Sequence, residues 1–249
     1  MSKQLVFTTI LILFLACMGT WAAEPGYELK IPKTPTAPKV DGVLDDAIWT
    51  ATAPVKVDNI NTGGKVDAPY VGDAWAAYDD NSLYVAFRNG EPNPNQITTT
   101  SPGHDQDVWK DDENELFIEP AYAGAKPYYH IMINAANVVQ DDESGGAEGA
   151  WDPASLQSAV KVGDKDWVLE LQIAFTDLGQ TKAPAEGTKW GFNFNRHIVS
   201  GVDIWAGWST TGPSFHTPER FGTLIFGAVV TAVAPSGKVA TSWGNLKRE

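Results

Sequence analysis

The chain has 249 residues, of which 43% are hydrophobic, 11% aromatic and 20% charged. This balance is that of an ordinary globular protein, and it excludes intrinsic disorder, a collagen repeat or a coiled coil for the chain as a whole. The formal net charge of −13 argues against nonspecific binding to nucleic acid or to an anionic membrane surface.

The first segment in chain order is a candidate export signal. Lys3 precedes the apolar run 5–16, which is too short to span a bilayer but suits the hydrophobic region of a secretory signal peptide. We therefore expect a signal peptide over residues 1–22, a secreted or periplasmic protein and no transmembrane segment. A lipid anchor on Cys17, the only cysteine, is an alternative, because residues 14–17 weakly resemble a bacterial lipobox.

The rest of the chain is expected to form one β-domain. Residues 23–37 are interpreted as a linker and the start of a first strand near 27–31, residues 38–226 as the domain, and residues 227–249 as a C-terminal tail. Short helical turns are expected at 45–49 and 175–178. Alternating apolar and polar residues between Gly, Pro and Asp predict further strands at 74–78, 82–88, 114–119, 128–134, 157–162, 167–173, 189–198, 203–208 and 222–226. The expected fold class is all-β, an antiparallel β-sandwich of jelly-roll type.

One loop concentrates acidic residues. Four aspartates stand close together there: Asp105, Asp107, Asp111 and Asp112. Lys110 is the only basic side chain among them, and calcium is a hard cation that takes six to eight oxygen ligands. We expect a structural calcium site in this loop, with a plain solvated loop as the alternative. Residues 141–143 form a similar but weaker acidic cluster.

Short motifs recur in an order that resembles one known family. The blocks are 41–49 (DGVLDDAIW), 77–86, 109–118, 167–175, 190–196, 208–209 and 215–222. Each block is weak alone, but their order and spacing over residues 38–226 together resemble the family 9 carbohydrate-binding modules. The resemblance implies an antiparallel β-sandwich, structural calcium and a noncatalytic protein that binds poly- or oligosaccharide. Some members are attached to xylanases, so a partner glycosidase of unknown identity is an expectation as well.

The resemblance also implies site residues. Two tryptophans of the family clamp the sugar, and motif position assigns that role to Trp109 and Trp208. Glu115 would accept hydrogen bonds from sugar hydroxyls, and Arg196 would donate a fork of hydrogen bonds.

The assignment of Arg196 meets a difficulty. Strict alternation places Arg196 on the same strand face as Phe192 and Phe194, so a structural ion pair is an equal alternative for it. Asn195 faces the other way and, with His130, is a second-rank candidate for binding sugar.

Three other functions remain open from the residues alone. A polysaccharide-active enzyme would need a carboxylate pair, and Glu115 with Glu170 is the pair that lies on predicted strands near the motifs. A haem-binding protein of the same fold would use Met132 with His197 or His216, because His130 lies too near Met132 on one strand to bind the opposite face of the haem. An interaction domain that kept the fold and lost the sugar site is the third alternative.

Overall fold

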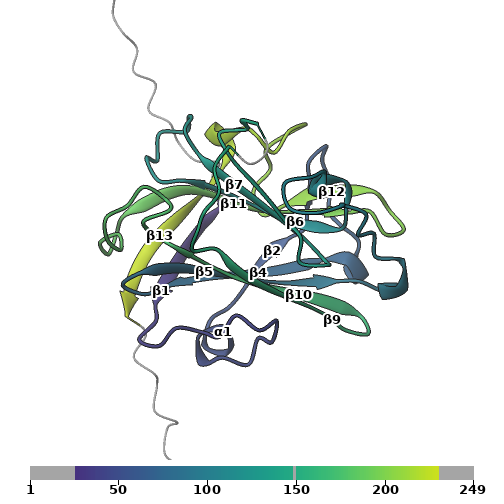
Figure 1. Ribbon diagram of the computed structural model, residues 1–249, viewed down its shortest axis with the longest axis horizontal. Helices are drawn as coiled ribbons and strands as arrows, with labels where there is room; N and C mark the ends of the chain where they lie inside the picture. The colour runs from purple at the N-terminus through teal and green to yellow at the C-terminus, as the bar shows by residue number, and fades with distance from the viewer. Residues whose placement is uncertain (1–25, 148–149, 230–249) are drawn as a thin grey trace, which may run out of the picture.

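The computed structural model describes residues 26–147 and 150–229, which form two stacked layers of β-strands (Figure 1). The expected signal peptide, Cys17 and nearly all of the expected tail lie outside the described residues. Within the described part of the chain, no helix is long and apolar enough to cross a membrane.

Short strands account for most of the regular structure. The strands are β1 (Glu28–Lys33), β2 (Val55–Val57), β3 (Asn59–Ile60), β4 (Gly72–Tyr78), β5 (Ser82–Gly90), β6 (Glu113–Glu119), β7 (Tyr129–Asn134), β8 (Val139–Glu143), β9 (Gln157–Val162), β10 (Asp166–Ala174), β11 (Lys189–Ile198), β12 (Ile204–Gly207) and β13 (Gly222–Val229). One α-helical turn, α1 (Ala47–Ala51), lies near the N-terminus. Four 3₁₀ turns complete the elements: Ala68–Tyr70, Pro94–Gln96, Val108–Lys110 and Pro218–Arg220.

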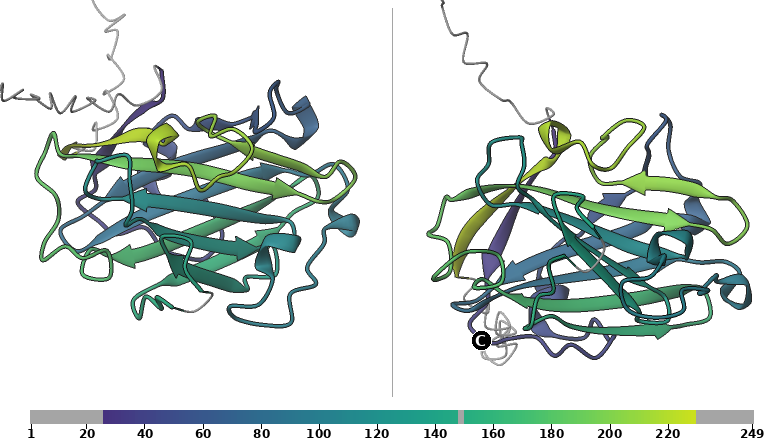
Figure 2. Two further views of the ribbon diagram at one scale, coloured as in Figure 1. Left: turned by 90° about the horizontal axis from the view of Figure 1, so that it is seen from above. Right: turned by 45° about the horizontal axis from the view of Figure 1, so that its top comes forward.

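The two layers are parts of one curled sheet. Its strands hydrogen-bond in the order β8-β7-β6-β11-β13-β1-β4-β5-β10-β9, with β12 on β11 and β2 on β4. The sheet turns over at β13 and β1, so that β6, β7, β8 and β11 lie above β4, β5, β9 and β10 (Figure 1, Figure 2). Most neighbouring strands are antiparallel, but β1 pairs in parallel with both β13 and β4.

The all-β prediction is confirmed, with local corrections. Strands were predicted over 157–162 and 189–198 with the limits that β9 and β11 have. The short strands β2, β3 and β8 were not predicted. The expected helical turn at 175–178 is a run of hydrogen-bonded turns rather than a helix. Most strand pairs are antiparallel, as expected, and the parallel pairs of β1 with β13 and β4 are exceptions.

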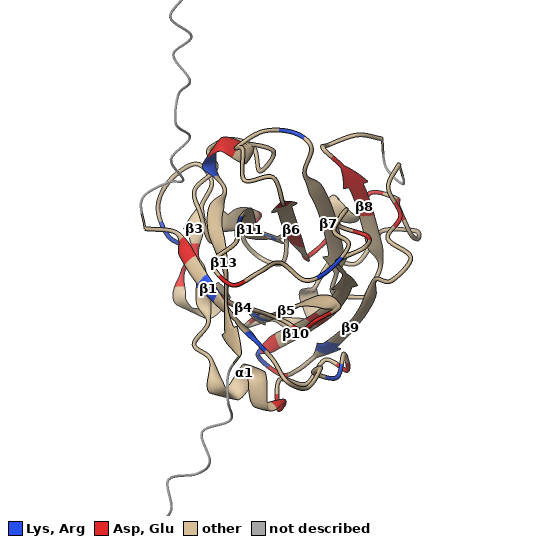
Figure 3. Cartoon of the chain, turned by 90° about the vertical axis from the view of Figure 1, so that its left-hand side faces the viewer, with Lys and Arg blue, Asp and Glu red and all other residues tan. Residues whose placement is uncertain are grey.

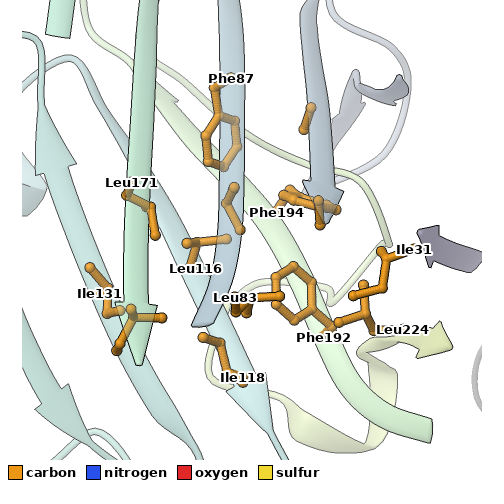
Figure 4. Packing of buried hydrophobic residues seen from close by; sticks show 14 of the residues in the cluster. Ile31, Leu83, Phe87, Leu116, Ile118, Ile131, Leu171, Phe192, Phe194 and Leu224 are labelled. Carbon is orange, nitrogen blue, oxygen red and sulfur yellow. The ribbon is translucent and has the colours of Figure 1, made fainter. Parts of the chain in front are cut away.

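The core lies between the two layers and follows from the alternation of apolar residues. Leu83, Val85 and Phe87 point inward from β5 and are fully buried. Phe192 and Phe194 point toward them from β11, and the rings of Phe87 and Phe194 meet edge to face with centroids 5.6 Å apart (Figure 4). Burial of this apolar surface is the main stabilisation of a domain that contains no cysteine in its described residues.

The outer face of the lower layer is covered by the N-terminal segment. One carboxylate oxygen of Glu170, on β10, accepts hydrogen bonds from the backbone N–H groups of Asp41, Gly42 and Val43. Its other oxygen accepts one from the indole of Trp49, at 2.8 Å. Gly42 has φ +77°, and a Cβ there would lie 2.9 Å from a side-chain carbon of Lys161. These contacts explain two residues of the pattern 41–49, because Gly42 allows the close approach to β9 and Trp49 bonds to Glu170.

Candidate functional site

A pocket of about 650 Å³ opens on the outer face of the upper layer. Its floor consists of alternate residues of β6, β7 and β8, and its walls come from the loops before β6, after β8 and beside β12. A cavity of this size is typical of small-molecule sites. It is lined by Ile60, Asn61, Thr62, Trp109, Glu115, His130, Met132, Gln140, Asp142, Gly145, Gly146, Asp203, Ile204, Trp205, Pro213, Ser214, Phe215 and His216.

The floor centres on a histidine held between two carboxylates. His130 donates from Nε2 to Glu115 Oε2 at 2.5 Å and from Nδ1 to Asp142 Oδ2 at 3.0 Å. The register of the three strands brings them together, since His130 on β7 pairs with Asp142 on β8. The ring of Phe117 stacks under the imidazole, with centroids 4.2 Å apart. The imidazole therefore has a fixed position and both of its nitrogens are engaged.

Electrostatics make this histidine a cation. Burial by itself lowers the pKa of His130, but the hydrogen bonds and charges of Asp142 and Glu115 outweigh it and raise the pKa to about 9. Burial likewise raises the pKa of Asp142, and there the bond to His130 prevails and lowers that pKa. The floor thus presents two carboxylates and one imidazolium, an arrangement that accepts hydrogen bonds from a ligand with many hydroxyl groups.

Two tryptophans stand at the sides of the pocket. Trp109, in the 3₁₀ turn before β6, has 42% of its surface exposed. Trp205, on β12, stacks on His197 with ring centroids 3.7 Å apart and an interplanar angle of 12°. Nδ1 of His197 donates to the backbone carbonyl of Trp109 at 2.9 Å, so this one histidine supports both tryptophans. Its Nε2 lies 3.0 Å from Asp203 Oδ1.

A second histidine stands beside the floor. His216 meets the ring of His130 edge to face, with centroids 4.9 Å apart, and its Nδ1 lies 2.9 Å from the hydroxyl of Tyr128. Burial and the positive charge of His130 lower the pKa of His216. His216 is therefore neutral at neutral pH, which leaves His130 as the charged member of the pair.

Three of the residues predicted from sequence line this pocket: Trp109, Glu115 and His130. They come from the turn before β6, from β6 and from β7, and the fold brings them to one cavity. Their role in binding a ligand remains a prediction.

The structure places Trp208 elsewhere, which corrects the expected clamp. Trp208 follows the end of β12 and turns into the core, where 5% of its surface is exposed. Its ring meets the edge of Phe194 at 5.7 Å and covers Gly222 so closely that a Cβ there would lie 2.5 Å from the indole. A side chain enclosed in this way has no face left for a ligand.

Arg196 and Asn195 also lie outside the pocket lining. Arg196 is fully buried on the inner face, and its Nη1 donates to the carbonyls of Tyr70 and Gly90 at 2.7 and 3.1 Å. Burial lowers its pKa to about 10, against the opposing charges of Asp112 and Glu91. Arg196 therefore lies on the core side with Phe192 and Phe194, as alternation predicted. Its contacts there are with the protein's own backbone carbonyls. Asn195 lies on the same side of the sheet as Glu115, its register partner on β6, but it is fully buried and does not line the pocket.

The four aspartates of the acidic loop are not gathered around one point. Asp111 accepts hydrogen bonds from the N–H groups of Thr100 and Ser101, and Asp112 accepts from those of Thr98, Val199 and Ser200. These two carboxylates therefore tie loops together.

The other two aspartates of that loop have separate partners. Asp107 pairs with Lys110 at the surface, at 2.9 Å, while Asp105 lies beside His104 and Asp141. The expected calcium ligand set, Asp105, Asp107, Asp111 and Asp112, does not fit a single ion in this arrangement.

The alternative functions can be compared with the same geometry. Glu115 and Glu170 lie on the outer faces of opposite layers with the core between them, so they cannot flank one glycosidic bond. Met132 and His130 lie two residues apart on the same face of β7, and both nitrogens of His130 are engaged by carboxylates, so His130 is not a haem partner for Met132. Of the other two candidate histidines, His197 has Nδ1 bonded to the carbonyl of Trp109 and Nε2 beside Asp203, which leaves neither nitrogen free. His216 lines the pocket with Met132, and its Nδ1 lies 2.9 Å from the hydroxyl of Tyr128.

Sequence reasoning missed several lining residues, and some signals for them were present. Trp205 lies three residues before the tryptophan that motif position favoured, and it alternates with the buried Ala206. Asp142 belongs to the weaker acidic cluster at 141–143, and His216 lies within the block 215–222. Gln140 had no such signal, because β8 was not predicted and its faces were therefore not assigned.

The sequence matches a known protein family over most of its length. The model of the family described as "carbohydrate family 9 binding domain-like" matches residues 40–227. No relative was found among curated protein sequences.

Three solved structures share the architecture. A family 9 carbohydrate-binding module from Caldicellulosiruptor kristjanssonii in complex with glucose is 19% identical with a TM-score of 0.61, over 84% of this chain and 100% of that one. The complex of such a module with cellotriose, from the same organism, is 20% identical with a TM-score of 0.61, over 83% and 98%. A putative carbohydrate-binding protein from Bacteroides uniformis is 18% identical with a TM-score of 0.65, over 80% and 99%.

Proposed function

The chain belongs to the carbohydrate family 9 binding domain-like family, and on that premise we propose that it is a carbohydrate-binding protein whose ligand occupies the pocket of the upper layer. The observation that carries the proposal is the combination of two tryptophans at the sides of one cavity with a charged, hydrogen-bonding floor. Since the solved modules of similar fold hold glucose and cellotriose, β-linked gluco-oligosaccharides are the first ligands to test.

The chemistry of a sugar matches the two parts of the pocket. A pyranose ring presents a face of C–H bonds, which stacks on an indole, and a rim of hydroxyl groups, which needs acceptors and donors. Trp109 and Trp205 supply the indoles. Glu115 and Asp142 supply acceptors, and Gln140 offers an amide that both donates and accepts.

The support of these groups favours recognition with little rearrangement. His197 fixes the main chain of Trp109 and stacks on Trp205, while His130 fixes the carboxylates of the floor. A preorganised site loses less conformational entropy when the ligand binds. In the proposed function the protein holds its saccharide without chemical change, as an accessory to polysaccharide breakdown.

We further propose that the protein acts outside the cytoplasm. The support is the apolar run 5–16 behind Lys3, followed by small residues up to Ala22. Mass spectrometry of protein secreted by a bacterial host should find a mature N-terminus at Ala23. A diacylglycerol group on Cys17 would instead establish the lipoprotein alternative.

The decisive experiment compares two tryptophans three positions apart. Calorimetric titration with cellotriose and glucose, guided by a glycan array, measures affinity for the unaltered protein, Trp109→Ala, Trp205→Ala and Trp208→Ala. We expect Trp109→Ala and Trp205→Ala each to weaken binding by about 1–3 kcal/mol, the range of a stacking anchor. Trp208→Ala should instead lower stability by about 3–5 kcal/mol, the cost of removing a large core side chain.

Two results would count against the proposal. If the unaltered protein binds no glycan on the array, this chain belongs to the family without binding carbohydrate, and the proposal is wrong. If Trp208→Ala loses affinity while it stays folded and Trp205→Ala does not, the clamp lies where the motif placed it. A separate incubation with oligosaccharides, analysed for cleaved products, tests the noncatalytic part, with Glu115→Gln as the variant that would abolish turnover.

A further inference from the structure

A compact group of possible metal ligands lies on the far side of β8 from the pocket. His104 and Asp105 come from the loop before β6, and Asp141 comes from β8, which is rich in acidic residues (Figure 3). One ligand atom from each of the three lies within 4.8 Å of the others. His104 Nδ1 is 2.8 Å from Asp105 Oδ2, and His104 Nε2 is 3.8 Å from Asp141 Oδ2.

Asp141 is the unusual member of this group. It pairs with Ile131 in the register of β7 and β8, and its side chain therefore lies on the core side of the sheet, with 0% of its surface exposed. Neither of its carboxylate oxygens has a hydrogen-bond partner among the described residues. In contrast, its neighbour Asp142 is bonded to His130 and to the N–H group of Gly145.

A buried carboxylate without partners is costly, because water is removed and nothing replaces it. The nearby charge makes the cost larger, since the carboxylate of Asp105 lies beside that of Asp141. A divalent cation would neutralise both carboxylates and take up the free lone pairs. The arrangement of His104, Asp105 and Asp141 thus favours a cation at the point between their ligand atoms.

We propose that His104, Asp105 and Asp141 bind a divalent transition metal ion with the ligand preference of zinc. One imidazole nitrogen and two carboxylate oxygens form a mixed nitrogen and oxygen ligand set, which zinc accepts in four-coordinate geometry with water in the remaining position. Calcium prefers six to eight oxygens and is a poorer match for three side chains that include an imidazole. His104 is exposed over 52% of its side chain, so an ion can reach the site from solvent.

The position of the site gives the metal a structural effect. The backbone N–H of Asp105 already donates to the carbonyl of Val139 at 2.9 Å, and Asp105 Oδ1 accepts from the N–H of Asp141 at 3.1 Å. A metal ion would fasten the same loop to β8 through side chains as well. Because that loop leads to Trp109 and β8 carries Gln140 and Asp142, the ion would brace two sides of the pocket.

The test titrates chelator-treated protein with zinc, in the absence of any saccharide, by calorimetry and by metal analysis after desalting. The variants are His104→Ala and Asp141→Asn, and the matched control is Asp107→Asn, an exposed aspartate of the same loop that pairs with Lys110. We expect one zinc ion per chain in the unaltered protein and in the control. Both site variants should bind at least about 10-fold more weakly, since the loss of a direct ligand should cost no less than the loss of an outer-shell partner. Thermal unfolding with and without zinc should show a rise in midpoint that both site variants lose.

Several outcomes would overturn the proposal. No saturable uptake of zinc would leave Asp141 as a buried carboxyl that keeps its proton. Equal uptake by the unaltered protein and both site variants would place the ion elsewhere. Tighter binding of calcium than of zinc, tested in a parallel titration, would refute the assignment to a transition metal. His104→Ala keeps the test valid if Asp141→Asn does not fold, since His104 is half exposed.

Discussion

The outer faces of the two layers each carry a buried glutamate on a central strand, and the two glutamates differ in their surroundings. Glu170, on the lower layer, receives four hydrogen bonds from the N-terminal segment, which closes that face. Glu115, on the upper layer, receives its hydrogen bond from His130 and lines an open pocket. A carboxylate whose acceptor sites are filled by its own chain serves the fold, whereas one that borders a cavity is available to a ligand.

The neighbours of the two glutamates follow the same division. Trp49 and Trp75 pack in the cluster that covers the lower layer, with 4% and 7% of their surfaces exposed. Trp109 on the upper side is 42% exposed beside the pocket. Aromatic side chains thus seal one face and border the cavity of the other.

The largest expected effect is a loss of stability when the contacts on the outer face of the lower layer are removed. Glu170→Ala should lower the free energy of unfolding by about 3–5 kcal/mol, because it leaves a buried indole N–H and several backbone N–H groups without an acceptor. Urea denaturation measures the loss, and saccharide affinity of the folded variant should be unchanged. Glu170→Gln, which keeps one acceptor oxygen, should lose less. A stable Glu170→Ala variant with weakened sugar binding would reverse the roles of the two faces.

The next expected effect is a pH dependence of the free energy of unfolding, caused by His130 on the upper layer. The pKa of His130 is about 9 in the folded protein and 6.5 in the unfolded chain, so the folded state holds the extra proton between these values. Its stabilisation is therefore complete below about pH 6.5 and is lost as the pH rises through about 9. The loss amounts to about 3 kcal/mol at most, from 1.36 kcal/mol per pKa unit.

Urea denaturation at pH 6 and pH 10, in the presence of a chelator, measures this difference. His130→Gln is the control, since it removes the titrating group and should flatten the pH dependence in this range. An equal decline in the variant would show that other groups cause it.

The smallest of the three effects concerns affinity. Glu115→Gln should weaken saccharide binding by about 1.5–3 kcal/mol, the value of a hydrogen bond to a charged group. Calorimetric titration gives the affinity, and circular dichroism checks that the variant is folded. The matched control is Glu143→Gln, at the exposed last residue of β8 and outside the pocket lining, which should bind as the unaltered protein does. Equal losses in both variants would point to net charge rather than to a contact.

Local patterns predicted the strands well where alternation was strong. Leu83, Val85 and Phe87 share one face by their spacing alone, and Asp79 adjoins a turn in which its carboxylate accepts from the N–H groups of Asn81 and Ser82. The strands that sequence missed have other causes. β2 and β3 are only three and two residues long, and β8 carries three consecutive acidic residues, which are rare in strands.

Motif position predicted Trp109 and Glu115 at the pocket, and alternation predicted the strand faces. Alternation placed Glu115 away from Leu116, and it set Arg196 beside Phe192 and Phe194, where the structure has it. Motif position alone favoured Trp208 over Trp205. The two differ in the direction in which β12 and the residues after it turn, and that direction depends on the pairing of β12 with β11 and on the space above Gly222.

The sequence by itself determined the all-β class, the faces of the long strands and the family to which the chain belongs, because these depend on residues that are near one another or on motifs in order. Only the tertiary structure decided which acidic side chains share an environment. Asp141 and Asp142 are adjacent, yet one bonds to His130 beside the pocket and the other faces the core next to His104. Alternation separates neighbours onto opposite faces, and strand pairing brings distant residues to each face, so the partners of a charge depend on the whole sheet.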